Sequence, residues 1–307
     1  MIVENQTDVK PILKWAGGKS QLLTEINLRL PKELKNGIIK NYCEPFLGGG
    51  AVFFFIAQNY FLEKLILVDI NEELILFYDV IKNNPHELID LIDQYKSKFN
   101  SINEKEQEKF YYEVRNNYNC NKNEINFRKY DKNWITRAAQ LLFLNKTCFN
   151  GLFRQNSKGE FNVPFGKYKN PQFYEKENIL IVSQLLQSAE LFVGDFENIE
   201  RFIDETFFVY FDPPYRPISK TSSFTSYTKN DFDEKDQIRL AELFKRLDKK
   251  GAKLMLSNSD PHNENPDDHF FETYYQNFKI ERVLASRMIN SNGNGRGKIN
   301  ELIITNY

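Results

Sequence analysis

A carboxylate, two prolines and an aromatic ring stand together in the run Asp212-Pro213-Pro214-Tyr215. They follow the apolar residues Phe207 to Phe211, which predict a buried strand that ends abruptly. Because proline has no N–H group, we expect the carbonyl oxygens at this strand end to be free acceptors. Two acceptors beside a ring suit a planar exocyclic amine, and an α/β sheet places its chemistry at this end of its strands. An Asp-Pro turn without function is the alternative, but the preceding strand and the following tyrosine favour chemistry.

Composition limits the class of protein. The chain has 307 residues, of which 41% are hydrophobic and 27% charged, as in a soluble globular protein of one large or two modest domains. The net charge is -1, so a polyanionic partner must meet a local basic face. The three cysteines and three histidines show no metal-ligand spacing, which argues against a zinc site and favours a reducing compartment. We see no signal peptide or membrane-spanning run and therefore expect a cytoplasmic protein.

Two glycine-rich segments come early in the chain. The run Lys14-Trp15-Ala16-Gly17-Gly18-Lys19 precedes a predicted helix, and its lysines suit a carboxylate or phosphate, although the spacing is not that of a Walker loop. The run Glu44-Pro45-Phe46-Leu47-Gly48-Gly49-Gly50 joins a short strand to an apolar helix. Asp69 ends the next strand about twenty residues later, where such folds place an acid that binds ribose hydroxyls. Each of these segments alone is common at the turns of α/β proteins. Together they indicate a binding site for an adenosine-containing ligand other than a dinucleotide.

The middle of the chain changes character. Apolar spacing predicts helices over 84–99, 104–118 and 134–144, with an Asn- and Lys-rich loop over 116–131. Basic and aromatic residues then alternate over 145–168 around the turn Ser157-Lys158-Gly159, which predicts a hairpin. Such a hairpin suits nucleic acid, because cations contact phosphates or guanine edges and rings stack on bases. A surface hairpin with a small core is the alternative that this stretch leaves open.

The rest of the chain returns to an α/β rhythm. Strands are predicted over 191–195, 253–258, 279–285 and 299–305, and an amphipathic helix over 231–249. A polar loop over 217–231 is long enough to be a lid. A second loop, 287–298, holds Arg287, Arg296 and Lys298 and is predicted to contact phosphate or to be merely mobile.

These motifs, in this order, closely resemble the Dam-type DNA adenine N6-methyltransferases over nearly the whole chain. The set also includes Asp69-Ile70-Asn71, Asn150-Gly151-Leu152-Phe153-Arg154 and the segment from Gly159 to Tyr168. The resemblance implies an α/β fold: a Rossmann-like methyltransferase sheet with an inserted helical DNA-recognition domain carrying a β-hairpin. It implies a catalytic domain that binds S-adenosylmethionine over 1–82 and 186–307, and target recognition over 83–185. The implied substrate is double-stranded DNA at the bacterial nucleoid, with a monomeric enzyme and no metal.

The resemblance also implies site residues, position by position. The residues implied for catalysis are Asp212, Pro213 and Tyr215. Those implied for the cofactor are Trp15, Lys19, Phe46, Gly48, Gly50, Asp69 and Asp212. Those implied for DNA are Lys14, Phe149, Asn150, Leu152, Arg154, Pro164 and Tyr168. Arg154 matches a residue that reads a guanine of GATC, and Phe149 stands where relatives often carry a tyrosine that enters the duplex.

Several readings stay open beside this one. The run Asp212-Pro213-Pro214-Tyr215 could also serve an enzyme that methylates a different DNA sequence, cytosine N4, RNA or a protein amide. Asp212 argues against the last three substrates, because enzymes that act on them often carry Asn or Ser at the first position of this run. An inactive methyl-binding relative is the non-enzyme alternative, but no motif residue is damaged. A restriction nuclease is a further alternative, but the metal-binding pattern of carboxylates and lysine that a nuclease needs is not evident in this sequence. A restriction endonuclease encoded nearby, without a stable complex, remains an open partner.

Overall fold

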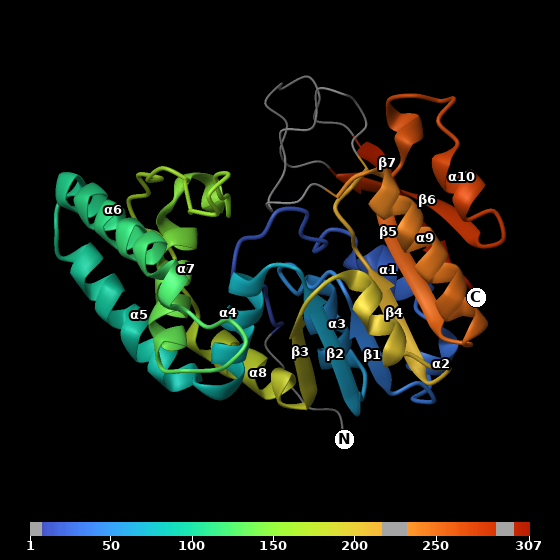
Figure 1. Ribbon diagram of the computed structural model, residues 1–307, viewed down its shortest axis with the longest axis horizontal. Helices are drawn as coiled ribbons and strands as arrows, with labels where there is room; N and C mark the ends of the chain where they lie inside the picture. Colours follow the sequence, from blue (N-terminus) through green and yellow to red (C-terminus); the bar gives the residue numbers. More distant parts are fainter. Residues whose placement is uncertain (1–7, 217–231, 287–297) are drawn as a thin grey trace.

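A seven-stranded sheet forms the centre of the computed structural model, which describes residues 8–216, 232–286 and 298–307 (Figure 1). Its strands are β1 (Asn41–Glu44), β2 (Lys64–Asp69), β3 (Ala189–Val193), β4 (Phe207–Phe211), β5 (Lys253–Ser259), β6 (Lys279–Ser286) and β7 (Lys298–Thr305). The order across the sheet is β3-β2-β1-β4-β5-β7-β6. Strands β1 to β5 run parallel, while β7 is antiparallel to both of its neighbours. The expected Rossmann-like α/β sheet is therefore confirmed.

Strand β4 is buried on both faces, as its unbroken apolar run predicts. All five of its residues are buried. Because side chains alternate along a strand, Phe208 and Tyr210 enter one hydrophobic core while Phe207, Val209 and Phe211 enter the other. Each fully buried large apolar side chain contributes about 1.5–3 kcal/mol of transfer free energy. This double burial fixes the position at which the chain leaves the sheet.

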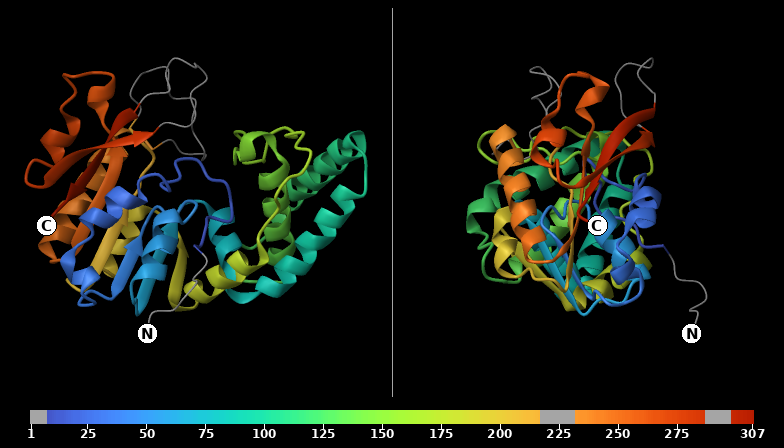
Figure 2. Two further views of the ribbon diagram at one scale, coloured as in Figure 1. Left: turned by 180° about the vertical axis from the view of Figure 1, so that it is seen from behind. Right: turned by 90° about the vertical axis from the view of Figure 1, so that its right-hand side faces the viewer.

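Helices cover both faces of the sheet. They are α1 (Leu23–Arg29), α2 (Lys32–Lys35), α3 (Ala51–Asn59), α4 (Glu72–Asn83), α5 (Pro85–Asn100), α6 (Glu104–Cys120), α7 (Asn133–Thr147), α8 (Lys176–Leu185), α9 (Glu234–Lys249) and α10 (Phe270–Tyr274). Figure 2 shows α9 on one side of the sheet and α1 on the other. In the part of the chain that the structure describes, no helix is long and apolar enough to cross a membrane.

Helices α5, α6 and α7 stand beside the sheet, at the left of Figure 1. A buried ion pair joins them to α4: Arg137 Nε donates to Glu73 over 2.8 Å, and the Arg137 guanidinium also binds the Tyr118 carbonyl of α6. Removing one partner of such a pair costs about 3–5 kcal/mol, because the other charge stays buried. One hydrophobic core runs from the sheet into these helices. The expected domain boundaries at 83 and 185 therefore remain a prediction.

The predicted loop over 116–131 is wrong at its start. Helix α6 continues to Cys120 and is followed by the 3-10 helix η1 (Asn121–Glu124). The cause is burial, since Tyr118 is 1% exposed and extends the apolar face of the helix by another turn. The predicted lid over 217–231 and residues 287–297 of the second predicted loop lie outside the described residues.

Candidate functional site

The Asp212 carboxylate lies just past β4 and pairs with a lysine from the N-terminal segment. Lys19 Nζ lies 2.6 Å from Asp212 Oδ1, and the two side chains are 6% and 19% exposed. Ser257 of β5 also donates to Asp212 Oδ1, over 3.4 Å. Burial raises the pKa of Asp212, while the Lys19 ammonium and the Ser257 hydroxyl act in the opposite direction. The predicted acceptor is thus present and held in place by two donors.

The Tyr215 ring is fixed through its hydroxyl group. Tyr215 Oη donates to Glu301 Oε2 of β7 over 2.5 Å. Burial, followed by the charges of Asp212 and Glu301, holds the pKa of Tyr215 well above its usual value, so the side chain stays a neutral phenol. Lys19 Nζ lies 4.5 Å from the ring centroid. Sequence reasoning missed both Glu301 and Ser257; the only signal was the polar end of the β5 strand.

The two proline carbonyls differ, which corrects the expectation that both are free. Pro214 O accepts a hydrogen bond from Gln237 Nε2 of α9 over 3.0 Å. Among the described residues, no donor reaches the carbonyl of Pro213. Pro213 is the proline that follows the carboxylate directly, so one carbonyl and one carboxylate remain as acceptors at this strand end.

The glycine turn after β1 is tied to the carboxylate that ends β2. Gly48 and Gly50 have φ of 48° and 71°, in the left-handed region that glycine adopts readily. The Gly48 N–H donates to Asp69 Oδ2 and the Asn71 N–H donates to Oδ1, both over 2.9 Å. Burial raises the pKa of Asp69 to about 6, although these N–H groups oppose the shift. The structure thus brings together the predicted glycines and the predicted ribose-binding acid.

Trp15 connects the glycine turn to the middle of the chain. A Cβ atom on Gly48 would lie 3.2 Å from Trp15 Cδ1, and one on Gly49 would lie 3.2 Å from Trp15 Cβ. The other neighbour of the indole is Phe153, whose ring stacks on it with centroids 5.1 Å apart and planes at 23°. A side chain at Gly48 or Gly49 would therefore crowd Trp15.

Phe46 packs against a different hydrophobic core from Trp15. It is half-buried, and its ring packs on Phe196 with centroids 5.4 Å apart and on Phe232 at 5.6 Å. Phe46 and Trp15 are both predicted cofactor contacts, and each presents a partly exposed ring next to the glycine turn.

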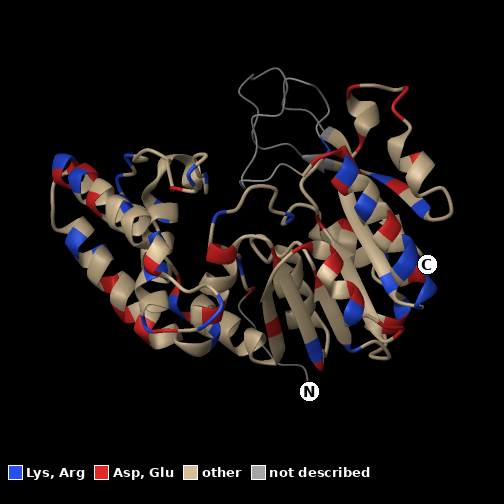
Figure 3. Cartoon of the chain, viewed as in Figure 1, with Lys and Arg blue, Asp and Glu red and all other residues tan. Residues whose placement is uncertain are grey.

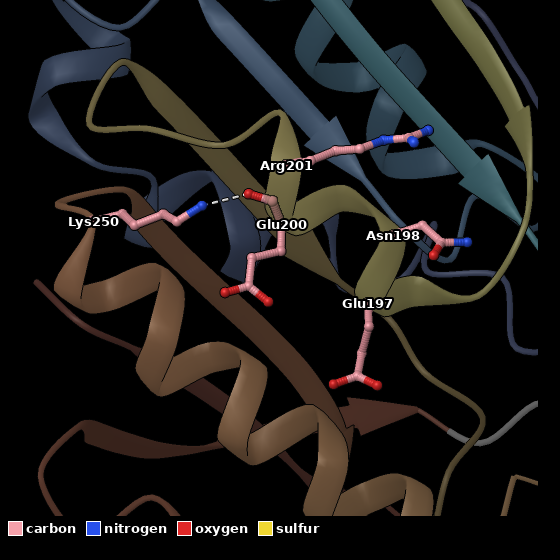
Figure 4. Close-up of a pocket in the computed structure, with 5 residues that line it drawn as sticks. All are labelled: Glu197, Asn198, Glu200, Arg201 and Lys250. Carbon is pink, nitrogen blue, oxygen red and sulfur yellow. Dashed lines mark hydrogen bonds between the residues drawn. The ribbon is translucent and has the colours of Figure 1, made fainter.

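The hollow drawn in Figure 4 belongs to a different surface. It lies between α9 and the 3-10 helix η4 (Phe196–Arg201) and is lined by Glu197, Asn198, Glu200, Arg201 and Lys250. None of these is a predicted site residue. Its acids are already engaged, since Glu197 pairs with Arg239 and Arg246.

The predicted hairpin is present, but with little regular strand. Isolated antiparallel bridges join Cys148 to Phe165 and Gln155 to Phe161. Side chains of α6 take up other backbone groups: Tyr111 Oη donates to the Val163 carbonyl over 2.7 Å, and Asn119 exchanges hydrogen bonds with both backbone groups of Phe161. These bonds replace a strand ladder, which is why no extended pairing forms.

Most of the predicted DNA-binding side chains lie on the surface of this hairpin. Phe149 is 52% exposed, and its N–H donates to the carbonyl of exposed Pro164 over 2.9 Å. Asn150 is exposed with φ of 57°. Exposed Arg154 donates through Nε to Asn162 Oδ1 over 2.8 Å, which leaves its other donors available. Leu152 is half-buried, and Figure 3 shows basic residues distributed around this region.

Asn145 docks the N-terminal segment on the hairpin and was not predicted as a site residue. Its side chain accepts from the Lys14 N–H over 2.8 Å and donates to the carbonyls of Lys14 and Gly151 over 2.9 and 3.1 Å. A Cβ on Gly151 would meet Lys14 Cδ at 2.2 Å. Lys14 Nζ lies 5.4 Å from the ring centroid of half-buried Tyr168. Lys14 and Tyr168, both predicted to contact DNA, are thus brought together.

Two histidines that are seven positions apart also meet. Ligand atoms of His262, His269 and Glu272 lie within 4.8 Å of one another. The sequence showed no such pattern, because the group forms only when α10 folds against the end of β5. Arg282 already contacts His262 Nδ1 at 2.9 Å and donates to Glu272. A positive charge at this position competes with any cation.

Comparison with known proteins agrees with this geometry. Residues 15–289 match the family of D12 class N6 adenine-specific DNA methyltransferases. The type II methyltransferase M.MjaIII of Methanocaldococcus jannaschii is 52% identical over 98% of this chain and 100% of its own length. M1.LlaDCHI, a type II methyltransferase of Lactococcus lactis subsp. cremoris, is 38% identical over 100% of this chain and 99% of its own length. The DNA adenine methylase of Escherichia coli K12 is 34% identical over 96% of this chain and 94% of its own length. The chain therefore belongs to the D12 class of N6 adenine-specific DNA methyltransferases.

Proposed function

We propose that this enzyme transfers a methyl group from S-adenosylmethionine to N6 of adenine in duplex DNA, within the sequence GATC. One observation carries the chemical part of the proposal. The Asp212 carboxylate, the carbonyl of Pro213 and the Tyr215 ring lie together at the end of β4. This arrangement supplies two acceptors and one stacking surface for a single flat amine.

The chemistry follows from the poor nucleophilicity of the amine. The N6 lone pair of adenine is delocalised into the ring, so nitrogen attacks only when it becomes pyramidal. Asp212 and Pro213 would accept the two N6 hydrogens and favour that shape. Tyr215 would stack on the base, which must leave the duplex to reach a site at the end of a buried strand. Positioning and electrostatics then supply the rate.

The reaction is a direct displacement. S-adenosylmethionine supplies a methyl group activated by its sulfonium. Nitrogen would form the new bond to the methyl carbon as the carbon–sulfur bond breaks, the bonding pair would stay on sulfur, and N6 would then lose one proton to solvent water. Asp212 lies close enough to an amine at this position to orient it throughout, and no covalent enzyme intermediate is required.

The residues around the glycine turn fit the cofactor. Gly48 is half-buried and has a positive φ angle, which leaves its backbone partly accessible, while a Cβ on buried Gly50 would lie 3.0 Å from Phe54. Each Asp69 oxygen accepts one backbone N–H and keeps further acceptor capacity for ribose hydroxyls. We therefore assign the cofactor to Trp15, Lys19, Phe46, Gly48, Gly50, Asp69 and Asp212.

DNA recognition is assigned to residues 83–185, and catalysis to 1–82 and 186–307. Arg154 would bind a guanine edge through donors that Asn162 does not use. Exposed Phe149 would enter the base stack beside the flipped adenine. Further contacts are assigned to Lys14, Asn150, Leu152, Pro164 and Tyr168. The choice of GATC depends on Arg154 and Tyr168 alone.

A different DNA sequence is the second candidate. Two relatives are named type II methyltransferases, which supports a place for this chain in a restriction-modification pair. A monomer suffices for the proposed chemistry, since every assigned group comes from one chain. Methylation of cytosine N4 or of RNA is a weaker candidate. Enzymes with those substrates often carry Asn or Ser at the position that Asp212 occupies in the run Asp212-Pro213-Pro214-Tyr215.

Transfer of labelled methyl from S-adenosylmethionine tests the proposal directly. The substrates are a duplex with one GATC and a matched duplex with those four bases scrambled. We expect label only on the GATC duplex, recovered as N6-methyladenine. Label on both duplexes would retain the chemistry and reject the GATC assignment, and label recovered on cytosine would reject the adenine assignment.

A further inference from the structure

The Lys19 ammonium sits in a small cage of three groups. Its Nζ lies 2.6 Å from Asp212 Oδ1, 3.0 Å from the Gly17 carbonyl and 4.5 Å from the centroid of the Tyr215 ring. Lys19 is 5% exposed. A lysine that only neutralised a carboxylate would not need a ring face as well. The cage is therefore more specific than an ordinary ion pair.

One wall of this cage, Asp212, is an acceptor for adenine N6 in the proposed function, and another, the Tyr215 ring, is the surface on which the base would stack. The Lys19 ammonium already binds the Asp212 carboxylate beside Tyr215. An incoming amine that used the same carboxylate oxygen would compete with the ammonium. We propose that Lys19 occupies the place of the target amine and releases Asp212 to it as an ionised carboxylate. This inference rests on the proposed function, because it takes adenine N6 as the incoming group.

The charges around Asp212 explain why the lysine matters before the amine arrives. Titratable and polar groups face the carboxylate from several elements: Lys19 before α1, Glu44 in β1, Tyr210 in β4, Tyr215 after β4, Ser257 in β5 and Glu301 in β7. In this described set only Lys19 carries a positive charge. Without it, burial and the neighbouring Glu301 charge act together and raise the pKa of Asp212 further.

Protonation of Asp212 would remove the site's main acceptor. A protonated carboxyl places a donor where the amine presents its own N–H. Lys19 therefore acts as a positioning residue that keeps the carboxylate ionised until the amine replaces it. The Gly17 carbonyl stays available to the displaced ammonium, so Lys19 keeps one partner after the exchange.

Lys19→Met separates these effects in a binding experiment without methyl transfer. The probes are two GATC duplexes, one with the target adenine and one with purine, which lacks the amine. The ratio of their dissociation constants measures what the amine contributes. Lys10→Met is the matched control, because Lys10 is exposed in the same N-terminal segment and its backbone groups are bound to Asn178. Lys19→Arg restores the charge.

We expect the variant and wild-type curves to cross with pH. At alkaline pH, Lys19→Met should prefer adenine over purine by roughly tenfold more than wild type, because no ammonium competes. At lower pH this preference should be lost in Lys19→Met before it is lost in wild type and in Lys19→Arg, because the Lys19 ammonium lowers the pKa of Asp212. A merely structural lysine would lower the preference at both pH values.

Two results would overturn the inference, and each differs from failure of the proposed function. Parallel curves for Lys19→Met and wild type would show that Lys19 neither competes with the amine nor holds Asp212 ionised. A Lys19→Arg curve identical to that of Lys19→Met would show that charge is not the relevant property. A wild-type protein with no preference for adenine over purine would instead reject Asp212 as the amine acceptor.

Discussion

The carboxyl edge of the sheet and the hairpin of residues 148–168 hold their functional groups in opposite ways. Asp212 is largely buried and paired with Lys19, and Tyr215 is fixed by Glu301. Arg154 is exposed and has one side-chain partner, Asn162. Charge stabilisation is strong where water is excluded and groups are preorganised. Sequence reading requires side chains that extend from the surface into a groove. The comparison predicts that the sheet edge controls turnover and the hairpin controls choice of site.

The N-terminal segment joins these two regions. Trp15 lies between the glycine turn and Phe153, and Asn145 binds the backbone of Lys14. Lys14 and Lys19 are five positions apart, yet one lies by the hairpin and the other at Asp212. A movement of the hairpin when it binds DNA would therefore be transmitted through the segment from Lys14 to Lys19 to the Asp212 carboxylate.

The largest effect is expected from Asp212→Ala, which tests whether the sheet edge controls turnover. Loss of the acceptor should lower kcat by about a thousandfold or more, since the amine is no longer oriented. The dissociation constant for a GATC duplex should rise only by the contribution of the lost amine contact, because the hairpin is intact. Single-turnover transfer and a binding isotherm on the same preparation measure both. Near-wild-type turnover in a folded variant would reject the assigned role.

Arg154→Ala should give the next largest effect, at the hairpin. Removing a bidentate guanine contact costs about 1–3 kcal/mol, or roughly 5- to 150-fold in kcat/KM on GATC. Duplexes changed at that guanine should lose almost nothing more, so specificity relaxes at one position. Lys158→Ala is the control, since an exposed lysine beside the same turn should weaken binding equally on all sequences. Uniform loss in Arg154→Ala would place this arginine on a phosphate.

The pH dependence of S-adenosylmethionine binding tests a second carboxyl group at the sheet edge, Asp69. Its pKa of about 6 means that it is ionised above that pH and protonated below it. Ribose hydroxyls need an ionised acceptor, so affinity for S-adenosylmethionine should fall as pH drops through about 6, by up to about tenfold per unit. Calorimetric titration from pH 5 to 8 measures this. Asp69→Asn should bind weakly and independently of pH; a flat wild-type profile would contradict the prediction.

The smallest effect is expected at Glu301, which contacts Tyr215 and not the hairpin. Glu301→Ala releases the Tyr215 hydroxyl, and we expect kcat to fall roughly threefold to tenfold, as for loss of a hydrogen bond of about 1 kcal/mol. Glu301→Gln retains an acceptor and should stay within about twofold of wild type. In a Tyr215→Phe background, Glu301→Ala should have no further effect. Additive losses would show that Glu301 acts through another group.

Local sequence was sufficient to predict most of the sheet. Strand β2 ends at Asp69, as the sequence predicts, because a short apolar run between polar ends has one stable arrangement in a parallel sheet. The hairpin was harder to predict. Its alternating residues suggested strands, but the structure binds them with Tyr111 and Asn119 from α6. Competition from a distant helix is invisible in a local pattern.

The sequence by itself determined which side chains could do chemistry: the carboxylate of Asp212 after a buried strand, the glycines of the β1 turn and the basic, aromatic stretch of the hairpin. Tertiary structure alone decided their partners. Only the folded chain places Lys19, which lies before α1, against Asp212 after β4, and only the antiparallel β7 brings Glu301 to Tyr215. The reason is physical: periodicity and turn chemistry act over a few residues, whereas burial and charge pairing depend on which surfaces the folded chain brings together.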